Sequence, residues 1–389
     1  MTDDNGTFDG STRRRFLALS AVAGAGALAG CGGGGNDNNQ TTVQATDSTV
    51  APSWYGSGPG AFEQRPTPGG TSMADMPNMS GTLNVYSGRG EGLVGDLVAY
   101  MEERYPNLTI NMTYASAADL ANKLVTEGQN TPADVFYSVN AGALGAVANE
   151  GLTQSLREGT YSLVGQEFRA SDNSWTGTSG RARTVPYNTN TLGESDVPDD
   201  VMQFPNLSQY EGEIGWAPTY SSFQAFVTAM RILEGDQATR NWLQGMQDLN
   251  VQEYPDEFAV SQAVADGELA MGFANHYYIQ RVLAGRPNAP IATGFTENDA
   301  GTVFNVAGAA RISASDKANL ADLFVRHLLS SEAQEYFAIR TFEYPLVEGV
   351  DPIGRLPPIS ELDVPNLDLS RLSDLGATID LMQDVGVLT

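Results

Sequence analysis

The apolar run Leu269-Ala270-Met271-Gly272-Phe273 leads, through one alanine, into Asn275-His276-Tyr277-Tyr278. Gly267 and Asn275 bound the run, and this pattern predicts a short buried strand. The tyrosine pair would then stand at a strand end, where α/β proteins place their ligand sites. A phenolate oxygen is hard and anionic, so two neighbouring phenols at such a place indicate a site for a hard trivalent cation.

Two observations weigh against this interpretation when the pair is taken alone. Most buried aromatic rings serve packing, and both tyrosines could do so. A free tyrosine also titrates near pH ~10, so a bound metal would have to supply the charge that removes the proton.

The composition limits the class of protein. A chain of 389 residues can form two domains with full cores. The net charge is −26, and only Lys123 and Lys317 among the 21 basic residues are lysine. Such a surface is typical of a protein kept soluble at high salt, so a halophilic source is our hypothesis, with an acidic mesophile as the alternative. The charge argues against a nucleic-acid partner.

The N-terminus carries export signals. Thr12 to Leu17 resembles a twin-arginine signal, and an apolar stretch to Gly30 follows that is too short to span a membrane comfortably. Leu28-Ala29-Gly30-Cys31 has the form of a lipobox, as in prokaryotic lipoprotein precursors, and Cys31 is the single cysteine. Residues 1–31 are therefore predicted to direct export and to place a lipid on Cys31, anchoring the chain to the outer face of the cell membrane. Residues 32–80, rich in Gly, Asn, Thr and Pro, are predicted to be a flexible tether.

The globular part is predicted to begin near Thr82 with alternating strands and helices. This rhythm indicates a mainly parallel sheet with helices on both faces. The predicted elements are strands 82–86, 108–112 and 133–137 and helices 92–103, 116–127 and 141–149. Leu93, Leu97 and Tyr100 would form the inner face of the first helix, and Ser116 would cap the second.

The second half predicts a further set of elements and a return to the first. Segment 181–187 is expected to be extended, and strand 214–217 runs into a helix whose first turn holds Ser221 and Ser222, where free N–H groups favour an anion. Helices 242–249 and 257–265, strand 301–309, helices 317–329 and 331–339 and an extended tail complete the prediction. A chain that leaves one sheet, forms a second and returns to the first is typical of two lobes joined by crossing strands.

Several motifs, taken together and in order, resemble the ferric-ion-binding proteins of ABC iron importers, a branch of the two-lobed extracytoplasmic solute-binding proteins. The resemblance spans nearly all of residues 82–389. Its motifs are Leu83-Asn84-Val85-Tyr86-Ser87-Gly88, Pro132-Ala133-Asp134-Val135-Phe136-Tyr137-Ser138, Ser179-Gly180-Arg181-Ala182-Arg183, Gln262-Ala263-Val264-Ala265-Asp266-Gly267-Glu268, Asn275-His276-Tyr277-Tyr278 and Glu343-Tyr344-Pro345-Leu346.

The resemblance implies an α/β fold of the type II periplasmic-binding-protein class, in which each lobe is a mainly parallel sheet flanked by helices. Residues 82–182 with 308–360 would form the first lobe, and residues 183–307 with 361–389 the second.

The same resemblance implies that Tyr277 and Tyr278 ligate Fe³⁺. Some relatives add a histidine after the first strand and a glutamate after the third, but Gly90 and Val139 stand at those positions here. Iron binding would therefore need other donors.

Three residues are candidates for these donors. Tyr220 ranks first, because a third phenolate would balance the charge of Fe³⁺, and it stands where relatives have an anion-binding serine. Glu91 ranks second, and Glu257 stands where some relatives have an anion-binding asparagine.

A small synergistic anion, carbonate or phosphate, is also implied beside the iron. Asn275 matches an anion-binding asparagine of the family, and Ser221 and Ser222 offer hydroxyl and N–H groups. Arg181 and Arg183 lie in the crossing segment, where one could face the anion and the other pair with surface carboxylates.

The two histidines receive plainer interpretations. Alternation along an extended segment would turn His276 away from Tyr277, so we expect packing rather than ligation. His327 is predicted to be an ordinary helix-face residue.

The sequence thus predicts a monomeric receptor that captures Fe³⁺ between two lobes and passes it to an ABC transporter permease. It contains no nucleophile–base pair, phosphate loop or zinc spacing, so we expect no enzymatic activity. One alternative is a receptor for another solute, such as thiamine, a polyamine or an oxyanion. The other is an exported metalloenzyme that uses the same tyrosines for hydrolysis.

Overall fold

The computed structural model describes residues 52–55, 58, 62, 65–373 and 375–388, which belong to one compact unit, Ser48–Thr389. The predicted signal with Cys31 and the first part of the tether lie outside the described residues. Within the described part, no helix has the length and apolar character needed to cross a membrane.

The centre of the fold is an eleven-stranded sheet with the path β2-β1-β3-β11-β5-β8-β6-β7. β10 and β9 also pair with β5, and β4 pairs with β11. The strands are β1 Gly81–Ser87, β2 Leu108–Tyr114, β3 Val135–Ser138, β4 Thr153–Gln154, β5 Thr176–Asn188, β6 Ile214–Trp216, β7 Gln252–Glu253, β8 Met271–Gly272, β9 Ala274–Asn275, β10 Ile291–Gly294 and β11 Phe304–Ile312.

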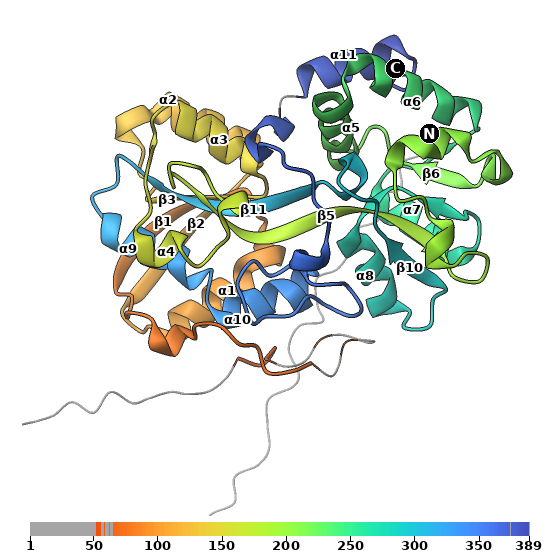
Figure 1. Cartoon of the computed structure of the whole chain (residues 1–389). Coiled ribbons are helices and arrows are strands. Elements are labelled where there is room, and N and C mark those ends of the chain that lie inside the picture. Colours follow the sequence, from red (N-terminus) through yellow and green to blue (C-terminus); the bar gives the residue numbers. More distant parts are fainter. Residues whose placement is uncertain (1–51, 56–57, 59–61, 63–64, 374, 389) are drawn as a thin grey trace, which may run out of the picture. The chain divides into compact units, whose positions relative to one another are not determined.

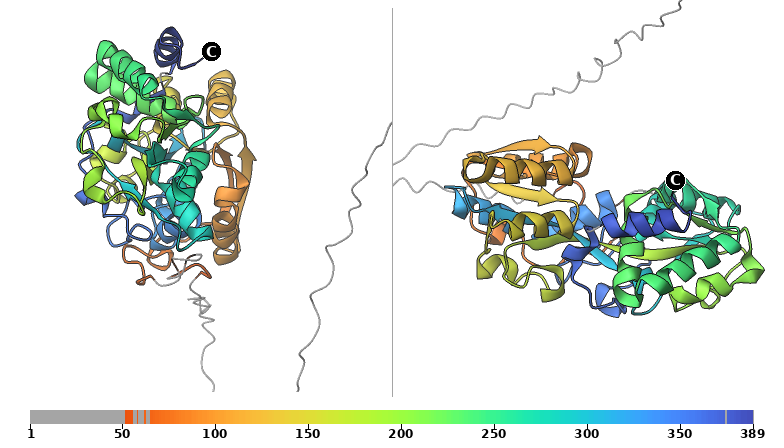
Figure 2. Two further views of the ribbon diagram at one scale, coloured as in Figure 1. Left: turned by 90° about the vertical axis from the view of Figure 1, so that its right-hand side faces the viewer. Right: turned by 90° about the horizontal axis from the view of Figure 1, so that it is seen from above.

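Helices cover both faces of this sheet, and the long strand β5 crosses the middle of the molecule (Figure 1). The α-helices are α1 Glu91–Arg104, α2 Ala117–Glu127, α3 Ala141–Asn149, α4 Glu158–Tyr161, α5 Ser221–Glu234, α6 Asp236–Asp248, α7 Glu257–Asp266, α8 His276–Gly285, α9 Ala318–His327, α10 Ser331–Tyr336 and α11 Gly376–Asp384. Viewed from above, the elements from β1 to α3 gather at one end, and those from β6 to α8 at the other (Figure 2). β5 pairs with β8 and β9 of the second group and with β11, which pairs with β3 of the first, so one hydrogen-bonded path connects them.

The predicted alternation of the first half is confirmed. β1 pairs in parallel with both β2 and β3, and β11 joins β3 antiparallel. Ser116 caps α2 by accepting a hydrogen bond from the Asp119 N–H, and Gly128 ends that helix at φ +54°. The predicted inner face of α1 was partly wrong, because Leu93 is 41% exposed; Val94, Leu97, Val98 and Met101 face the core instead.

Three further predictions were wrong. The expected strand 269–273 is reduced to the short β8 and β9, and the tyrosine pair, which does follow a strand end, lies in the first turn of α8. His327 is fully buried and its Nε2 lies 2.8 Å from the Tyr105 hydroxyl, so it is a core residue. The C-terminal tail is not simply extended, because it contains α11, which buries Leu381 and Met382.

The described residues at the end of the predicted tether also pack against the body. Trp54 lies between Tyr100 and Tyr336, with ring centroids 5.1 and 5.2 Å away, and its indole N–H donates to a backbone carbonyl of α10. Arg65 donates two hydrogen bonds to Glu335. The composition of this stretch is loop-like, but single large side chains fix it, which a compositional argument does not detect.

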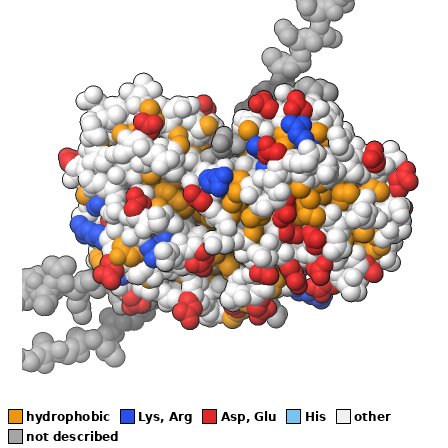
Figure 3. Space-filling view, turned by 45° about the horizontal axis from the view of Figure 1, so that its top comes forward, with side chains coloured by type: hydrophobic (Ala, Val, Ile, Leu, Met, Phe, Trp, Pro, Cys, Tyr) orange, Lys and Arg blue, Asp and Glu red, His pale blue; other side chains and the backbone are white. Residues whose placement is uncertain are grey.

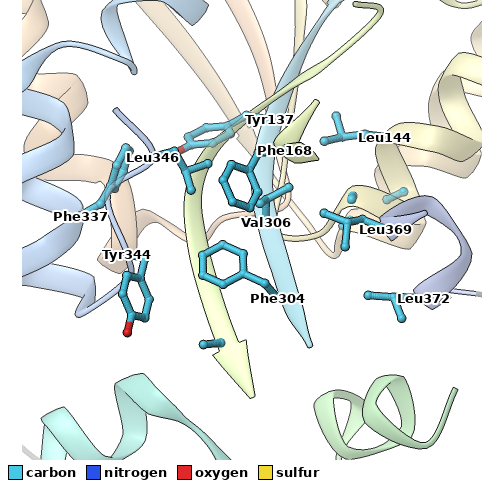
Figure 4. Packing of buried hydrophobic residues seen from close by; sticks show 14 of the residues in the cluster. Tyr137, Leu144, Phe168, Phe304, Val306, Phe337, Tyr344, Leu346, Leu369 and Leu372 are labelled. Carbon is cyan, nitrogen blue, oxygen red and sulfur yellow. The ribbon is translucent and has the colours of Figure 1, made fainter. Parts of the chain in front are cut away.

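The core at the middle of β5 and β11 is close-packed (Figure 4). Phe168 and Tyr344 flank the Phe304 ring at centroid distances of 5.1 and 5.6 Å. Gly180 on β5 permits this arrangement, because a Cβ there would lie 2.1 Å from the Phe304 ring. The acidic residues, by contrast, spread over the outer surface (Figure 3).

Candidate metal centre

Three tyrosines meet where two helices begin. Tyr277 and Tyr278 lie in the first turn of α8, with ring centroids 4.3 Å apart. Tyr220 directly precedes α5, and its hydroxyl lies 2.5 Å from that of Tyr278. Tyr278 is buried, while Tyr220 and Tyr277 are partly exposed. We call these three residues the tyrosine cluster.

The sheet explains why residues almost 60 positions apart meet. β6 and β8 are parallel neighbours, so their carboxyl ends lie at one edge of the sheet. Tyr220 follows β6 after a short turn, and the tyrosine pair follows β8 and β9. Ligand sites of α/β folds form at such an edge, where the strands give way to helix N-termini.

The environment keeps Tyr277 and Tyr278 protonated in the absence of a cation. Burial raises the pKa of Tyr277, and Arg181 partly opposes this rise. Burial also raises the pKa of Tyr278, and Tyr277 and the hydrogen bond to Tyr220 raise it further. Phenols that share one hydrogen-bonded cluster cannot all ionise unless a nearby positive charge compensates. The cluster is therefore suited to a multivalent cation that displaces the protons.

A pocket of about 170 Å³ lies beside the cluster. Its lining includes the residues predicted to bind an anion, which are Arg181, Ser221, Ser222 and Asn275, and it also includes Arg183. Asn275 connects the pocket to the cluster, because its side-chain amide donates to the Tyr277 hydroxyl at 3.3 Å. The structure thus gathers these residues around one cavity, and their roles as ligands stay predictions.

Glu257 is bound by residues that line this pocket. It is fully buried and forms an ion pair with Arg183, whose side chain is 1% exposed. Glu257 also accepts hydrogen bonds from the Ser222 hydroxyl at 2.5 Å and from the Asn275 backbone N–H at 2.9 Å. This carboxylate is therefore fixed by three donors, which leaves it poorly placed to act as the extra metal ligand considered above.

A second buried ion pair lies near Arg181, which lines the pocket. Arg89, in the loop after β1, donates to Glu343 at 2.7 Å, and Ser179 of β5 donates to the same carboxylate at 2.8 Å. Arg181 donates to the Val139 carbonyl, and its Nε lies 4.0 Å from Glu343. The sequence analysis missed Arg89 as part of this region, because its partner lies 254 positions away.

The remaining predicted residues take other places. Glu91 is exposed at the start of α1. Burial of the Tyr114 phenol raises its pKa, and the nearby negative charge of Glu91 raises it further. No hydrogen bond joins Glu91 to the tyrosine cluster within the described part of the chain. A Cβ at the neighbouring Gly90 would meet no atom within 4 Å, so this loop borders open space.

His276 is held by the backbone on both ring nitrogens. Its Nδ1 accepts from the Ala182 N–H at 3.1 Å, and its Nε2 lies 2.8 Å from the Phe342 carbonyl. Burial lowers its pKa to about 4, so the ring is neutral. Its packing role agrees with the prediction, but the reason was wrong, because His276 starts a helix. Among the described residues no three His, Cys, Asp or Glu side chains group together as a metal site would require, so a metal centre here depends on phenol oxygens.

Comparison with known proteins supports the resemblance. The family described as bacterial extracellular solute-binding protein matches residues 96–360. The Major ferric iron-binding protein of Neisseria meningitidis serogroup B is 29% identical over 310 residues, which cover 78% of this chain and 93% of that protein. Iron uptake protein A2 of Synechocystis sp. is 30% identical over 317 residues, covering 73% and 87%.

Solved structures agree with the expected two-lobed fold. Iron-bound HitA from Pseudomonas aeruginosa superimposes with a TM-score of 0.69 at 27% identity, covering 80% of this chain and 100% of that one. The Trichodesmium protein FutA, in complex with iron and citrate, gives a TM-score of 0.67 at 26% identity, covering 79% and 99%. The fold, the site at the edge of the sheet and the matched length lead to one conclusion: this chain belongs to the bacterial extracellular solute-binding protein family.

Proposed function

We propose that this protein is an extracytoplasmic receptor that captures Fe³⁺, with a small anion, and delivers it to an ABC transporter permease. The observation that carries the proposal is the tyrosine cluster, in which two hydroxyls lie 2.5 Å apart and a third phenol packs against them. Three phenolates balance the charge of one Fe³⁺, and hard oxygen donors suit that ion. The relatives named for ferric iron and iron uptake support the same cargo.

Capture would proceed by closure of two lobes, with residues 82–182 and 308–360 in the first and 183–307 and 361–389 in the second. The tyrosine cluster belongs to the second lobe and would bind the ion first. The first lobe would then complete the coordination, and Glu91 is the carboxylate that it could bring. The ion's greater affinity for the closed form drives the change.

The N-terminal signals complete the proposal. The twin-arginine motif would export the folded protein, and a lipid on Cys31 would hold it at the outer face of the membrane as a monomeric receptor. The acidic surface fits a source rich in salt. Labelling of the expressed protein with a fatty-acid analogue, compared with Cys31→Ser, tests the anchor.

The test of the cargo is the colour of the iron complex. Addition of Fe³⁺ at neutral pH should give a phenolate-to-iron charge-transfer band, with one iron per chain by metal analysis. Tyr277→Phe and Tyr278→Phe should each weaken iron binding and shift or remove the band. Tyr254→Phe, a phenol outside the cluster, should leave both unchanged. A colourless wild type that holds no iron would favour the receptor for another small solute.

A further inference from the structure

We propose that Glu257 determines which anion the pocket accepts, by cancelling the charge of Arg183 and so selecting a singly charged anion over a doubly charged one. This inference rests on the proposed function, because it concerns the anion that accompanies the metal. It adds a specificity role to a residue that is not itself a ligand of the metal or of the anion.

The pocket is built to hold an anion. Arg183 lines it and is almost completely buried, and its Nε and Nη2 have no hydrogen-bond partner within the described part of the structure. Its Nη1 is bound to Glu257. Nε atoms of several other arginines also lack a hydrogen-bond acceptor, but among the described residues Arg183 is the one that leaves a buried terminal nitrogen, Nη2, without a partner. Because the desolvation of such a donor is unfavourable, it points to a ligand. Ser221 and Ser222 add the first N–H groups of the 14-residue helix α5 at the same wall.

The buried charges around the pocket nearly cancel. The Arg183–Glu257 and Arg89–Glu343 pairs are each neutral. Arg181 is the surplus cation, because Glu343 is already paired with Arg89 and lies 4.0 Å from the Arg181 Nε. In the open form, before Glu91 of the first lobe approaches, three phenolates would neutralise Fe³⁺. The region then has one uncompensated positive charge, which a singly charged anion cancels.

Glu257 fixes this balance of charges because its carboxylate is held in one position. Its carboxylate is fully buried and is held by the Arg183 guanidinium, the Ser222 hydroxyl and the Asn275 backbone. A doubly charged anion would meet this fixed negative charge across the shared arginine, in a site where water cannot screen it. With glutamine at this position, two positive charges would remain uncompensated, and a doubly charged anion would fit best.

Formate and sulfate, which carry one and two negative charges at neutral pH, test this inference. Each is titrated into the iron-loaded protein in a fixed potassium chloride background, and its dissociation constant is taken from the shift of the charge-transfer band. Wild-type protein should bind formate at least tenfold more tightly than sulfate. Glu257→Gln should change that ratio at least tenfold in favour of sulfate. Glu257→Asp, which keeps the charge, should retain the preference for formate.

Glu268→Gln is the matched control, because it removes one exposed carboxylate just after α7 and makes the net charge less negative by the same one unit. It should leave the ratio unchanged. The two anions differ in shape, but the change of ratio between Glu257 and its glutamine variant cancels that difference. If Glu257→Gln does not fold, by circular dichroism, the wild-type ratio decides alone.

A wild type that prefers sulfate, a ratio that Glu257→Gln leaves unaltered, or no response to either anion would overturn the inference. These results differ from failure of the proposed function, in which the wild-type protein develops no iron colour at all.

Discussion

Replacement of Tyr278 by phenylalanine should reduce by one the number of protons that the protein releases when it binds Fe³⁺. Its hydroxyl is hydrogen-bonded to Tyr220 and buried beside Tyr277, and both neighbours raise its pKa further above the ordinary value of 10. At pH 7 the phenol is therefore fully protonated before the metal arrives. Ligation by a phenolate must release that proton.

The magnitude follows from the pKa. A phenol that titrates at 10 or above costs at least about 4 kcal/mol to ionise at pH 7, since each pKa unit corresponds to about 1.4 kcal/mol. Each proton released on ligation makes iron binding about tenfold tighter for each unit by which pH rises, so the release of three protons gives roughly a thousandfold, for a given free Fe³⁺ concentration. With Tyr278→Phe the dependence should fall to about a hundredfold for each unit.

The assay is a proton-release measurement in weakly buffered solution, calibrated by acid titration, with iron added as the same chelate to every variant. The protons taken up by the chelator are the same in each sample, so the difference between wild type and variant isolates the tyrosine. Tyr277→Phe and Tyr220→Phe should each also release one proton fewer. Tyr254→Phe should release the same number as wild type.

A result in which Tyr278→Phe binds iron, keeps the wild-type band and releases the wild-type number of protons would refute the argument. It would mean that this hydroxyl is not a ligand, and that its short contact with Tyr220 is only a hydrogen bond between packed rings.

Three stability predictions follow from the fold. Burial lowers the pKa of His327 to about 4, below the unfolded value of ~6.5. The contribution of neutral His327 to the free energy of unfolding is therefore fully present above pH ~6.5, and up to about 3 kcal/mol is lost as pH falls to about 4. In urea unfolding, stability should fall less with decreasing pH in His327→Gln than in wild type. Arg65→Ala leaves the buried Glu335 carboxylate without its guanidinium and should cost about 3 kcal/mol, seen as a lower midpoint in the same assay. Gly180→Ala drives a methyl group into the Phe304 ring and should lower the free energy of unfolding by about 3 kcal/mol or more, or prevent folding. The control Gly285→Ala places its methyl group in open space and should melt at the wild-type temperature.

Local patterns were sufficient for most of the first half of the fold. The β1, β2 and β3 strands and the intervening helices follow from apolar periodicity and from end signals such as Ser116, which do cap as expected. Leu93 shows the limit of periodicity, because the inner face of α1 begins one residue later, at Val94, and the Leu93 side chain faces solvent. The packing of Trp54 could not be inferred from its neighbours, since its contacts are with α1 and α10, far along the chain.

The same distinction applies to the site. The residue types of Tyr277, Tyr278 and Tyr220 pointed to a shared role, and the structure brings their rings together. The ion pair between Arg183 and Glu257 was not foreseen, because its members are 74 positions apart and each matched a different local motif. Charge pairing at this distance in sequence depends on the sheet register, which local patterns do not specify.

The tyrosine pair was predicted in the wrong element but at the right edge of the sheet, and the difference matters for the chemistry. A strand end carries no helix dipole. The first turn of α8 and the start of α5 are each a helix N-terminus, where partial positive charge favours an anion. Tyr220, at the N-cap of α5, and Tyr277 and Tyr278, in the first turn of α8, therefore lie at the positive ends of two helix dipoles. Burial nevertheless raises the pKa of Tyr277 and Tyr278 and keeps their protons in place before a cation arrives. Loss of these protons therefore depends on the arriving cation, and a trivalent ion supplies more of the required positive charge than a monovalent one.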